Sequence, residues 1–230
     1  MSINEAIILA GGLGTRLRSA VPDLPKCMAP INGKPFIAYV IDHLQQQGIN
    51  KFILSLGYKS EAIVDFIHQR FSNIDFQFSI EAEPLGTGGA IQLSCSKTTE
   101  QNVLVTNGDT LFKINAAKLS ALHKQSNADC TLSLKPMTNF DRYGVVEMNE
   151  QNQIISFKEK QFYESGLING GVYALNVQSF LNEELPQKFS FEKDYLEEFY
   201  STKKMLGVVQ DEYFIDIGIP EDYNRAQKEL

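Results

Sequence analysis

The feature that most constrains the fold is a regular alternation of short apolar runs with helix-like segments through the first 125 residues. The apolar runs are typical of strands and occur at residues 5–10, 51–57, 76–80 and 102–109. Segments with apolar residues at helical spacing follow them at 36–48, 60–71, 87–94 and 115–125. This order predicts an α/β fold with a Rossmann-like, mainly parallel sheet flanked by helices. Ligands of such folds bind at the carboxyl ends of the strands.

The pattern changes after residue 128, where strands follow one another with few long helices between them. The strand-like runs are residues 128–134, 143–148, 153–159 and 168–175, followed by short runs in KMLGVVQ and EYFIDIG. Helices are predicted at 189–200 and 220–230. No linker or repeat separates the two parts, so we expect one domain over 1–230 whose second half adds mixed or antiparallel strands.

Capping residues mark several helix ends in the sequence. Ser60, Asn115 and Ser190 occupy positions where a side chain is expected to cap a helix N-terminus. Gly48 is placed to end the first helix, and Pro220 lies in the first turn of the last one.

Charge and composition exclude several classes of function. The net charge of −7 argues against nucleic acid as a partner, because phosphate backbones require a basic surface. No apolar run approaches the roughly 20 residues that cross a bilayer, and the N-terminus does not resemble a signal peptide. The three cysteines are widely spaced and form no CxxC pair, which fits a reducing compartment. We therefore expect a cytoplasmic protein without a membrane partner.

The stretch GGLGTRL at residues 11–17 directly follows the first predicted strand and raises three alternatives. A Walker A loop would need a lysine that is missing here. A dinucleotide fingerprint would need a third glycine, which is also missing. The remaining alternative is a different phosphate cradle, in which glycine N–H groups approach phosphate oxygens while Arg16 and Lys26 supply positive charge.

Seven segments together resemble the signature of the sugar-1-phosphate nucleotidylyltransferases. They are LAGGLGTRLRSAVPDLPKCMAPINGKP, EAEPLGTGGAI, NGD (107–109), YGVV (143–146), FKEK (157–160), NGGVY (169–173) and FIDIGIPEDY (214–223). The segments span nearly the whole chain in the family's order. One departure is Ser19, where many members carry proline, and we expect it to alter the shape of the loop and not the chemistry.

The resemblance implies that the two halves of the chain bind different substrates: residues 1–127 form a nucleotide-binding half and residues 128–230 a sugar-binding half. The reaction would join a nucleoside triphosphate to a sugar 1-phosphate and release pyrophosphate. The residues implied as catalytic are Arg16, Lys26 and Asp109. Those implied in nucleotide binding are Leu9, Gly11, Gly12, Gly14, Thr15, Arg16, Lys26, Glu81, Gly86, Thr87 and Gly108. Those implied in sugar-phosphate binding are Gly144, Glu159, Lys160, Asn169 and Gly170.

The implied cofactor is Mg²⁺, held by Asp109 and Asp216. Two carboxylates completed by substrate phosphates suit this ion, which dehydrates reluctantly. The implied partners are small molecules, the nucleoside triphosphate and the sugar 1-phosphate. Family members are commonly dimers or tetramers, so the resemblance also allows a homo-oligomer.

The identity of the base depends on Glu81. A carboxylate only accepts hydrogen bonds, and guanine offers two adjacent donors, whereas uracil and thymine offer one donor between two acceptors. Glu81 would therefore favour GTP if it faces the base; otherwise Glu83 or the backbone reads it, and Glu81 is a solvated residue at a strand end.

The family contains a subgroup to which the chain is most similar. The segments GGLGTRLRS, EPLGTGGAI, DRYGVVE, LINGGVY and FSFEKDYLE resemble the guanylyltransferases of D-glycero-α-D-manno-heptose 1-phosphate, which make GDP-heptose. The alternatives are a mannose 1-phosphate guanylyltransferase, a UTP- or dTTP-using hexose 1-phosphate enzyme, and a non-catalytic regulator that binds sugar nucleotides. An NAD-dependent oxidoreductase is opposed by the missing third glycine.

Overall fold

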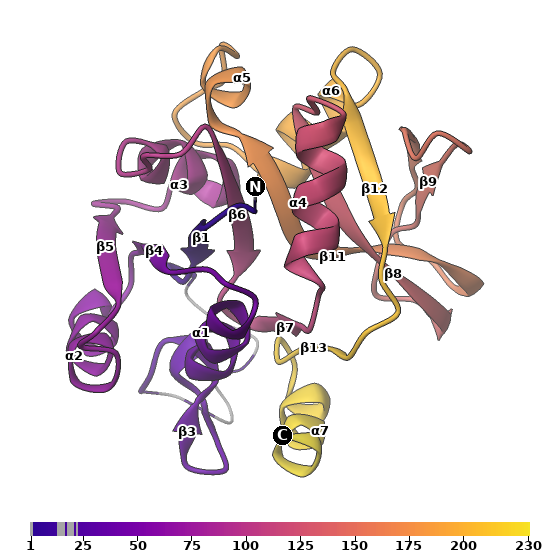
Figure 1. Ribbon diagram of the computed structural model, residues 1–230. Helices are drawn as coiled ribbons and strands as arrows, with labels where there is room; N and C mark the ends of the chain where they lie inside the picture. The colour runs from indigo at the N-terminus through magenta and orange to yellow at the C-terminus, as the bar shows by residue number, and fades with distance from the viewer. Residues whose placement is uncertain (1, 13–16, 18–20, 22) are drawn as a thin grey trace.

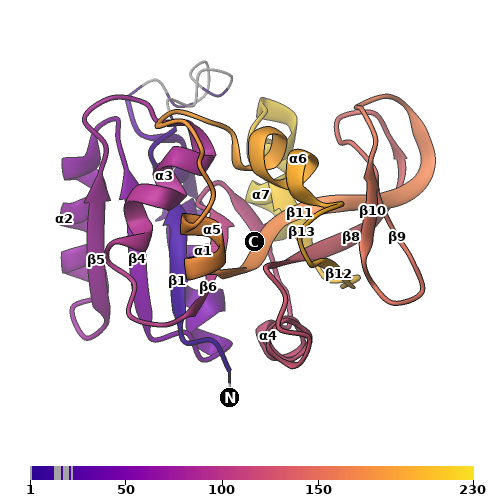
Figure 2. The same ribbon diagram turned by 90° about the horizontal axis from the view of Figure 1, so that it is seen from above.

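The centre of the protein is one seven-stranded mixed sheet, seen here in a computed structural model that describes residues 2–12, 17, 21 and 23–230 (Figure 1). Its strand order is β12-β8-β11-β6-β1-β4-β5. The seven strands are β1 (Glu5–Leu9), β4 (Lys51–Leu56), β5 (Asp75–Ile80), β6 (Asn102–Asn107), β8 (Cys130–Phe140), β11 (Tyr163–Asn176) and β12 (Met205–Val209). β5 and β12 are the edge strands of the sheet, and Figure 2 shows the β9–β10 pair beyond β12, at the end of the molecule far from β5.

Six of these strands run in one direction. β6, β1, β4 and β5 pair in parallel, as does β12 with β8, and β11 pairs antiparallel with β6 on one side and β8 on the other. The prediction of a Rossmann-like, mainly parallel sheet is confirmed, and the antiparallel element expected in the second half is β11. The functional division at residue 127 stays a prediction, but strands from both sides of it share one sheet.

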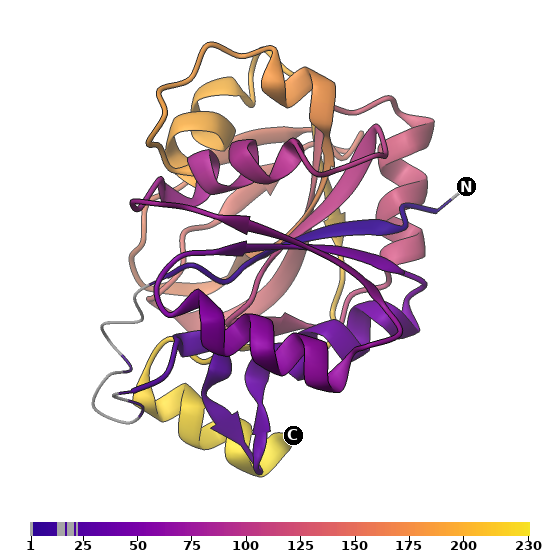
Figure 3. The same ribbon diagram turned by 90° about the vertical axis from the view of Figure 1, so that its left-hand side faces the viewer.

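Helices cover both faces of the sheet (Figure 3). On one face lie α1 (Phe36–Gln46), α2 (Ser60–Arg70) and α4 (Ala116–Gln125); the other carries α3 (Gly86–Cys95), α5 (Val177–Leu181), the π-helix η3 (Phe191–Leu196) and α6 (Glu197–Phe199). The alternation of β1 explains the two layers: Ala6 and Ile8 belong to the first buried cluster, and Ile7 to the second. Both faces of the central strands are buried, which is why their sequences are continuously apolar.

Short elements complete the fold around the carboxyl ends of the strands. They are η2 (Lys26–Met28), β2 (Pro30–Ile31), β3 (Lys34–Pro35), β7 (Thr110–Phe112), β9 (Val146–Met148), β10 (Ile154–Phe157), β13 (Phe214–Asp216) and α7 (Pro220–Glu229). β2 and β3 form a hairpin, β9 pairs with β10, and β13 pairs with β7. The β2–β3 hairpin, β7 and α5 were not predicted, because elements this short leave almost no periodic pattern.

The capping predictions have mixed outcomes. Asn115 accepts a hydrogen bond from the backbone N–H of Lys118 at 2.9 Å, and Ser190 accepts one from Lys193 at 3.2 Å, as predicted. The prediction for Ser60 was wrong: the chain enters α2 through Lys59 in the left-handed conformation (φ 52°), and Ser60 is already the first helical residue. The segment 189–200 is also not one α-helix, since its first part is the π-helix η3.

Candidate active site

The candidate site lies at the carboxyl ends of β1 and β6, where the family-like segments converge. The backbone N–H of Gly108 donates to the carbonyl of Leu9 at 2.8 Å and joins the two strand ends. A Cβ on Gly108 would lie 3.0 Å from that carbonyl oxygen, so glycine permits the approach. The ends of β1 and β6 are therefore fixed side by side at Leu9 and Gly108, and Asp109 follows directly after Gly108.

The pairing of β7 with β13 brings the two expected metal ligands together (Figure 1). Asp216 lies opposite Thr110 in this pair, and the N–H of Ile217 donates to the carbonyl of Asp109 at 3.1 Å. The two carboxylates thus lie on adjacent backbones although the residues are far apart in the sequence.

Lys26 lies between these carboxylates. Its ammonium group forms an ion pair with Asp109 and a second one with Asp216 Oδ1 at 3.4 Å. The Lys26 side chain is only 12% exposed, because η2 anchors it between the buried Cys27 and Met28 and the carboxylates. Cation and anions together form a compact charged cluster at the edge of the sheet.

Cys27 is the nucleophile nearest to this cluster in the sequence, but burial suppresses its reactivity. Burial raises the pKa of the Cys27 thiol to about 12, and the charge of Asp109 adds to the shift. The thiol is protonated at neutral pH, and the thiolate is the reactive form. The site therefore offers charge and positioning and no activated thiol.

The aspartate pair has the chemistry that a magnesium ion requires. Carboxylate oxygens are preferred ligands of Mg²⁺, and Asp216 Oδ1 is oriented by a hydrogen bond of 2.8 Å from the N–H of Gly218. A Cβ on Gly218 would lie 2.9 Å from Asp216 Oδ1 and 3.0 Å from Lys26 Nζ, so a side chain at this position would displace the charged groups. The described residues contain no cluster of three or more His, Cys, Asp or Glu side chains suited to a metal ion.

Only part of the predicted glycine cradle can be placed. Gly14, Thr15 and Arg16 lie outside the described residues, as does Ser19. Gly11 packs against Glu81, since a Cβ on Gly11 would lie 2.9 Å from Glu81 Oε1. Gly12 is exposed, with nothing within 4 Å of the position its Cβ would take.

Glu81 is held at the carboxyl end of the neighbouring strand β4. Its N–H donates to the carbonyl of Leu56 at 2.9 Å, and its Oε2 accepts the N–H of Leu85 at 3.1 Å. The other oxygen, Oε1, lies against Gly11 and Gly57, where an added Cβ on Gly57 would be only 2.7 Å away. Gly57 was missed from the sequence, although its position directly after an apolar run at a strand end was a usable signal.

Gly86 contacts the segment before η3, and Thr87 contacts η3 itself. Gly86 has φ +74°, and its Cβ would lie 2.4 Å from the carbonyl oxygen of Phe189. The Thr87 hydroxyl donates to Glu192 at 2.7 Å and accepts the N–H of Phe191 at 2.8 Å. Both residues thus have a packing role within the protein, and their nucleotide contact stays a prediction.

Asn169 and Gly170, which were expected to bind the sugar phosphate, lie in β11, and Gly170 packs against β7, the strand that follows Asp109. Asn169 precedes an irregularity in β11, where its Oδ1 accepts the N–H of Gly171 at 3.0 Å. A Cβ on Gly170 would lie 2.4 Å from the ring of Phe112, the last residue of β7. The strand β11 therefore packs closely against the strand that follows Asp109.

The other sugar-side residues lie in or near the loops around the β9–β10 pair. A Cβ on Gly144 would lie 2.3 Å from the carbonyl oxygen of Lys158. Glu159 and Lys160 are exposed beyond β10. Burial and the charge of Glu159 raise the pKa of Glu197 in α6. These exposed groups can meet a polar ligand from the solvent side.

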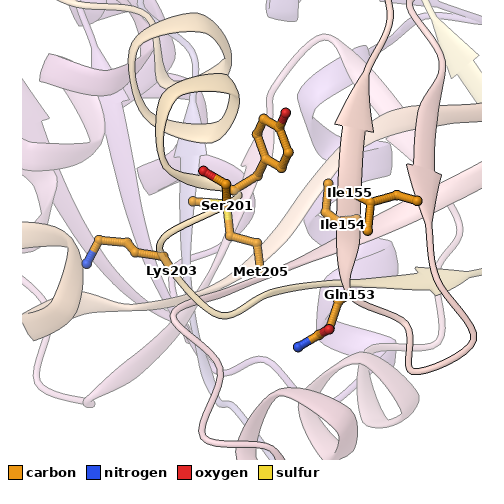
Figure 4. Close-up of a pocket in the computed structure, with 7 residues that line it drawn as sticks. Gln153, Ile154, Ile155, Ser201, Lys203 and Met205 are labelled. Carbon is orange, nitrogen blue, oxygen red and sulfur yellow. The ribbon is translucent and has the colours of Figure 1, made fainter.

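A separate cavity of about 290 Å³ lies between β10, the end of α6 and β12 (Figure 4). Its lining is formed by Gln153, Ile154, Ile155, Tyr200, Ser201, Lys203 and Met205. Lys203 extends away from Gln153 and Ile155 and pairs with Glu183 at 2.6 Å. None of the residues that line the cavity is an aspartate or glutamate, unlike those of the cluster at Lys26.

This α/β sheet with a lysine between two aspartates at its carboxyl edge fits the class of enzymes that act on phosphates. Residues 5–230 match the model of the family described as Nucleotidyl transferase, and the chain belongs to this family. None of the helices in the described part of the chain is long and apolar enough to cross a membrane.

Individual relatives cover nearly the whole chain. The chain is 54% identical over 226 residues to the D-glycero-alpha-D-manno-heptose 1-phosphate guanylyltransferase of Aneurinibacillus thermoaerophilus, with 98% of each chain covered. It is 48% identical over 219 residues to the protein of the same name from Campylobacter jejuni, covering 95% of this chain and 96% of the relative. The crystal structure of HddC from Yersinia pseudotuberculosis complexed with GMP-PN matches with a TM-score of 0.87 and 38% identity, covering 100% of this chain and 99% of that chain.

Proposed function

We propose that the protein transfers GMP from GTP to D-glycero-α-D-manno-heptose 1-phosphate and releases pyrophosphate. The observation that carries the proposal is the similarity, over nearly the full length, to two enzymes named for this reaction, at 54% and 48% identity. The structure matched in complex with GMP-PN, whose name denotes a guanine nucleotide, supports the choice of base.

In the proposed reaction, a phosphate oxygen of the sugar 1-phosphate attacks the α-phosphorus of GTP. A bond forms between this oxygen and the α-phosphorus, the bond from the α-phosphorus to the bridging oxygen of the β-phosphate breaks, and pyrophosphate leaves. No protein nucleophile is needed, which fits a site built from backbone groups and charges and a Cys27 thiol held protonated by burial. The tasks left to the protein are to position two polyanions and to stabilise the negative charge that develops.

Lys26 would supply that stabilisation. Its ammonium already lies at the end of β6 beside Asp109, and it would contact the reacting phosphates once they enter. Arg16, with the glycine backbone at Gly11, Gly12 and Gly14 and the hydroxyl of Thr15, would hold the triphosphate. These roles follow from the family pattern and from the position of the strand ends.

Asp109 and Asp216 would hold Mg²⁺, and Lys26 would give up its ion pairs with them as it turns to the phosphates. When bound, the ion would neutralise phosphate charge and orient the triphosphate for in-line attack. The carboxylates suit this role because the backbone N–H of Gly218 orients one of them, and Gly218 brings no side chain against it.

Glu81 would read guanine. One of its oxygens accepts the N–H of Leu85, yet a carboxylate has about four lone-pair sites, so acceptors remain for the base. Gly86 and Thr87 would shape this part of the pocket through their contacts with the segment before η3 and with η3 itself.

The sugar phosphate would bind on the side of the aspartate pair that faces away from the nucleotide. Gly144 and Gly170 would let the ligand approach the backbone closely. Glu159 and Asn169 would hydrogen-bond to its hydroxyl groups, and Lys160 would meet its phosphate.

We also infer a cytoplasmic location, because the three cysteines are buried and unpaired and suit a reducing compartment.

The test is pyrophosphate release with Mg²⁺, using GTP, ATP, CTP, UTP and dTTP against a panel of sugar 1-phosphates. Release that requires GTP and the heptose phosphate supports the whole proposal. Release with mannose 1-phosphate, or with UTP or dTTP and a hexose phosphate, replaces the substrate and keeps the mechanism. No release with any pair favours a non-catalytic regulator that binds sugar nucleotides.

A further inference from the structure

An ion pair connects the loop before β9 to the last helix. Arg142, in the loop that also carries Gly144, places its Nη1 2.6 Å from Oδ2 of Asp222 in the first turn of α7. Asp222 is 8% exposed and also pairs with Arg225, at 3.3 Å. A carboxylate in the first turn of a helix is favoured by the helix dipole. The loop at residues 141–145 is therefore tied to α7 by a largely buried charge.

The same guanidinium also contacts its neighbour Tyr143. Arg142 Nη2 donates to the Tyr143 hydroxyl at 3.0 Å, and the guanidinium carbon lies 5.4 Å from the centre of the Tyr143 ring. An arginine can serve two partners in this way because its planar fork presents several donors in fixed directions. Arg142 thus fixes the orientation of a half-buried phenol.

Tyr143 belongs to the wall beside the aspartate pair. Its ring packs edge-on against Phe214 with centroids 5.9 Å apart, and Phe214 packs edge-on against Phe112 at 5.6 Å. These two phenylalanines face each other in the β7–β13 pair that carries Asp216. Burial and the charge of Asp216 raise the pKa of Tyr143, which is consistent with a phenol near that carboxylate.

We propose that Arg142 is a positioning residue: held by Asp222, it orients the Tyr143 hydroxyl and the Gly144 loop toward the Asp109–Asp216 pair and so sets the affinity for the sugar phosphate. The assignment of the loop to the sugar phosphate rests on the proposed function. The tether of the loop to α7 and to Tyr143 rests on the contacts alone. The two parts are tested separately.

The first experiment measures the tether without any substrate. Hydrogen exchange followed by mass spectrometry is compared for the unaltered protein, Arg142→Ala and Arg225→Ala. Arg225 is the matched control, because it pairs with the same Asp222 but does not donate to Tyr143. Faster exchange of residues 141–146 in Arg142→Ala alone supports the tether; equal exchange in all three proteins, or equally faster exchange in both variants, overturns it.

The second experiment measures the consequence, using the sugar phosphate that supports turnover in the unaltered protein. Losing a charge-assisted hydrogen bond should raise the KM for the sugar phosphate by about tenfold in Arg142→Ala, with the KM for the nucleotide unchanged. Tyr143→Phe should raise it similarly, and the double variant should be no worse than either single one, because Arg142 acts through the phenol.

Other outcomes overturn the proposal. A fall in kcat with both KM values unchanged, or fully additive effects in the double variant, would assign Arg142 a different role. If the unaltered protein releases no pyrophosphate with any substrate pair, the proposed function fails and the role in substrate affinity falls with it. The hydrogen-exchange result still decides the tether in that case.

Discussion

The ion pairs of Lys26 lead to a prediction about metal binding that can be tested without turnover. The Lys26 ammonium interacts with Asp109 and with Asp216, the two carboxylates proposed to hold Mg²⁺. The ammonium and a divalent cation therefore compete for the same oxygens. Replacing the lysine by methionine keeps most of the side-chain volume and removes the competing charge.

The structure allows the size of the effect to be worked out. At the 3.4 Å that separates Lys26 Nζ from Asp216 Oδ1, the Coulomb attraction is about 5 kcal/mol with an effective dielectric constant of about 20. Hydration of the released ammonium offsets most of this attraction, and partly exposed pairs retain about 1–2 kcal/mol. Lys26→Met should therefore tighten the binding of a divalent cation to the free protein by about tenfold.

The assay is titration of the nucleotide-free protein with Mn²⁺, followed by electron paramagnetic resonance of the free ion. We expect a lower Kd in Lys26→Met together with a loss of pyrophosphate release. Lys34→Met is the matched control, because Lys34 pairs with Asp42 at 2.5 Å in a part of the chain without a proposed ligand. Unchanged or weaker Mn²⁺ binding in Lys26→Met, relative to this control, would refute the competition.

Four further predictions concern single positions. Asp109→Asn should lower Mg²⁺-dependent pyrophosphate release by about 10²–10³-fold, because it removes a carboxylate from the proposed site, while thermal melting stays close to that of the unaltered protein. Glu81→Gln should lower the ratio of kcat/KM for GTP over UTP, since an amide both donates and accepts. His123 is buried between Thr131 and Asn102, and burial lowers its pKa to about 4, so urea unfolding should show the free energy of unfolding falling by about 3 kcal/mol between pH 6.5 and 4. Gly170→Ala should destabilise the fold by about 1–3 kcal/mol in the same assay, because its Cβ would lie 2.4 Å from the Phe112 ring.

Each of these four predictions has either an outcome that contradicts it or a control variant. Near-normal turnover in Asp109→Asn removes that residue from metal binding, and an unchanged nucleotide preference in Glu81→Gln removes Glu81 from base reading. The sign for His123 follows from its lowered pKa. Above pH 6.5 the ring is neutral in both the folded and the unfolded chain. Between pH 6.5 and 4 the unfolded chain binds a proton at this ring and the folded chain does not, so the free energy of unfolding falls. His123→Gln should flatten this dependence. Phe112→Leu, added to Gly170→Ala, should recover part of the lost stability.

The parts of the fold that could be predicted are those with a strong local pattern. β1, β4 and β6 are apolar because neighbours bury them, and this shows in the sequence without knowledge of the partners. β5, at the edge of the sheet, is mostly half-buried or exposed, and its phenylalanines alternate with polar residues. Asn115 is a cap through a contact only three residues away. The elements that were missed, such as β7 and α5, owe their existence to tertiary contacts.

The candidate site combines both situations. Asp109 was expected as a metal ligand because it lies in the family-like segment NGD, since a position after a strand alone would also suit a turn residue. Its proximity to Asp216 depends on a pairing between strands of three residues each. Thr87 lies in a family motif, yet its hydroxyl bonds to Glu192, 105 residues away. Arg142 and Asp222 both lie in segments that resemble the family, DRYGVVE and FIDIGIPEDY. Nothing in the local sequence, however, predicts that these two opposite charges will form an ion pair. Such long-range contacts are decided by the packing of the whole chain.

The place of β11 in the sheet has a consequence for engineering. This strand is hydrogen-bonded on one side to β6, from the first half of the chain, and on the other side to β8. The two halves are joined there by backbone hydrogen bonds between neighbouring strands. A hinge movement of one half against the other about residue 127 would have to break these hydrogen bonds. Under the proposed function, substrates would then enter past the surrounding loops and not through a hinge between the two halves. A change of sugar specificity should accordingly be sought by grafting the loops at residues 141–145 and 158–162, and not by exchanging residues 128–230 as a cassette.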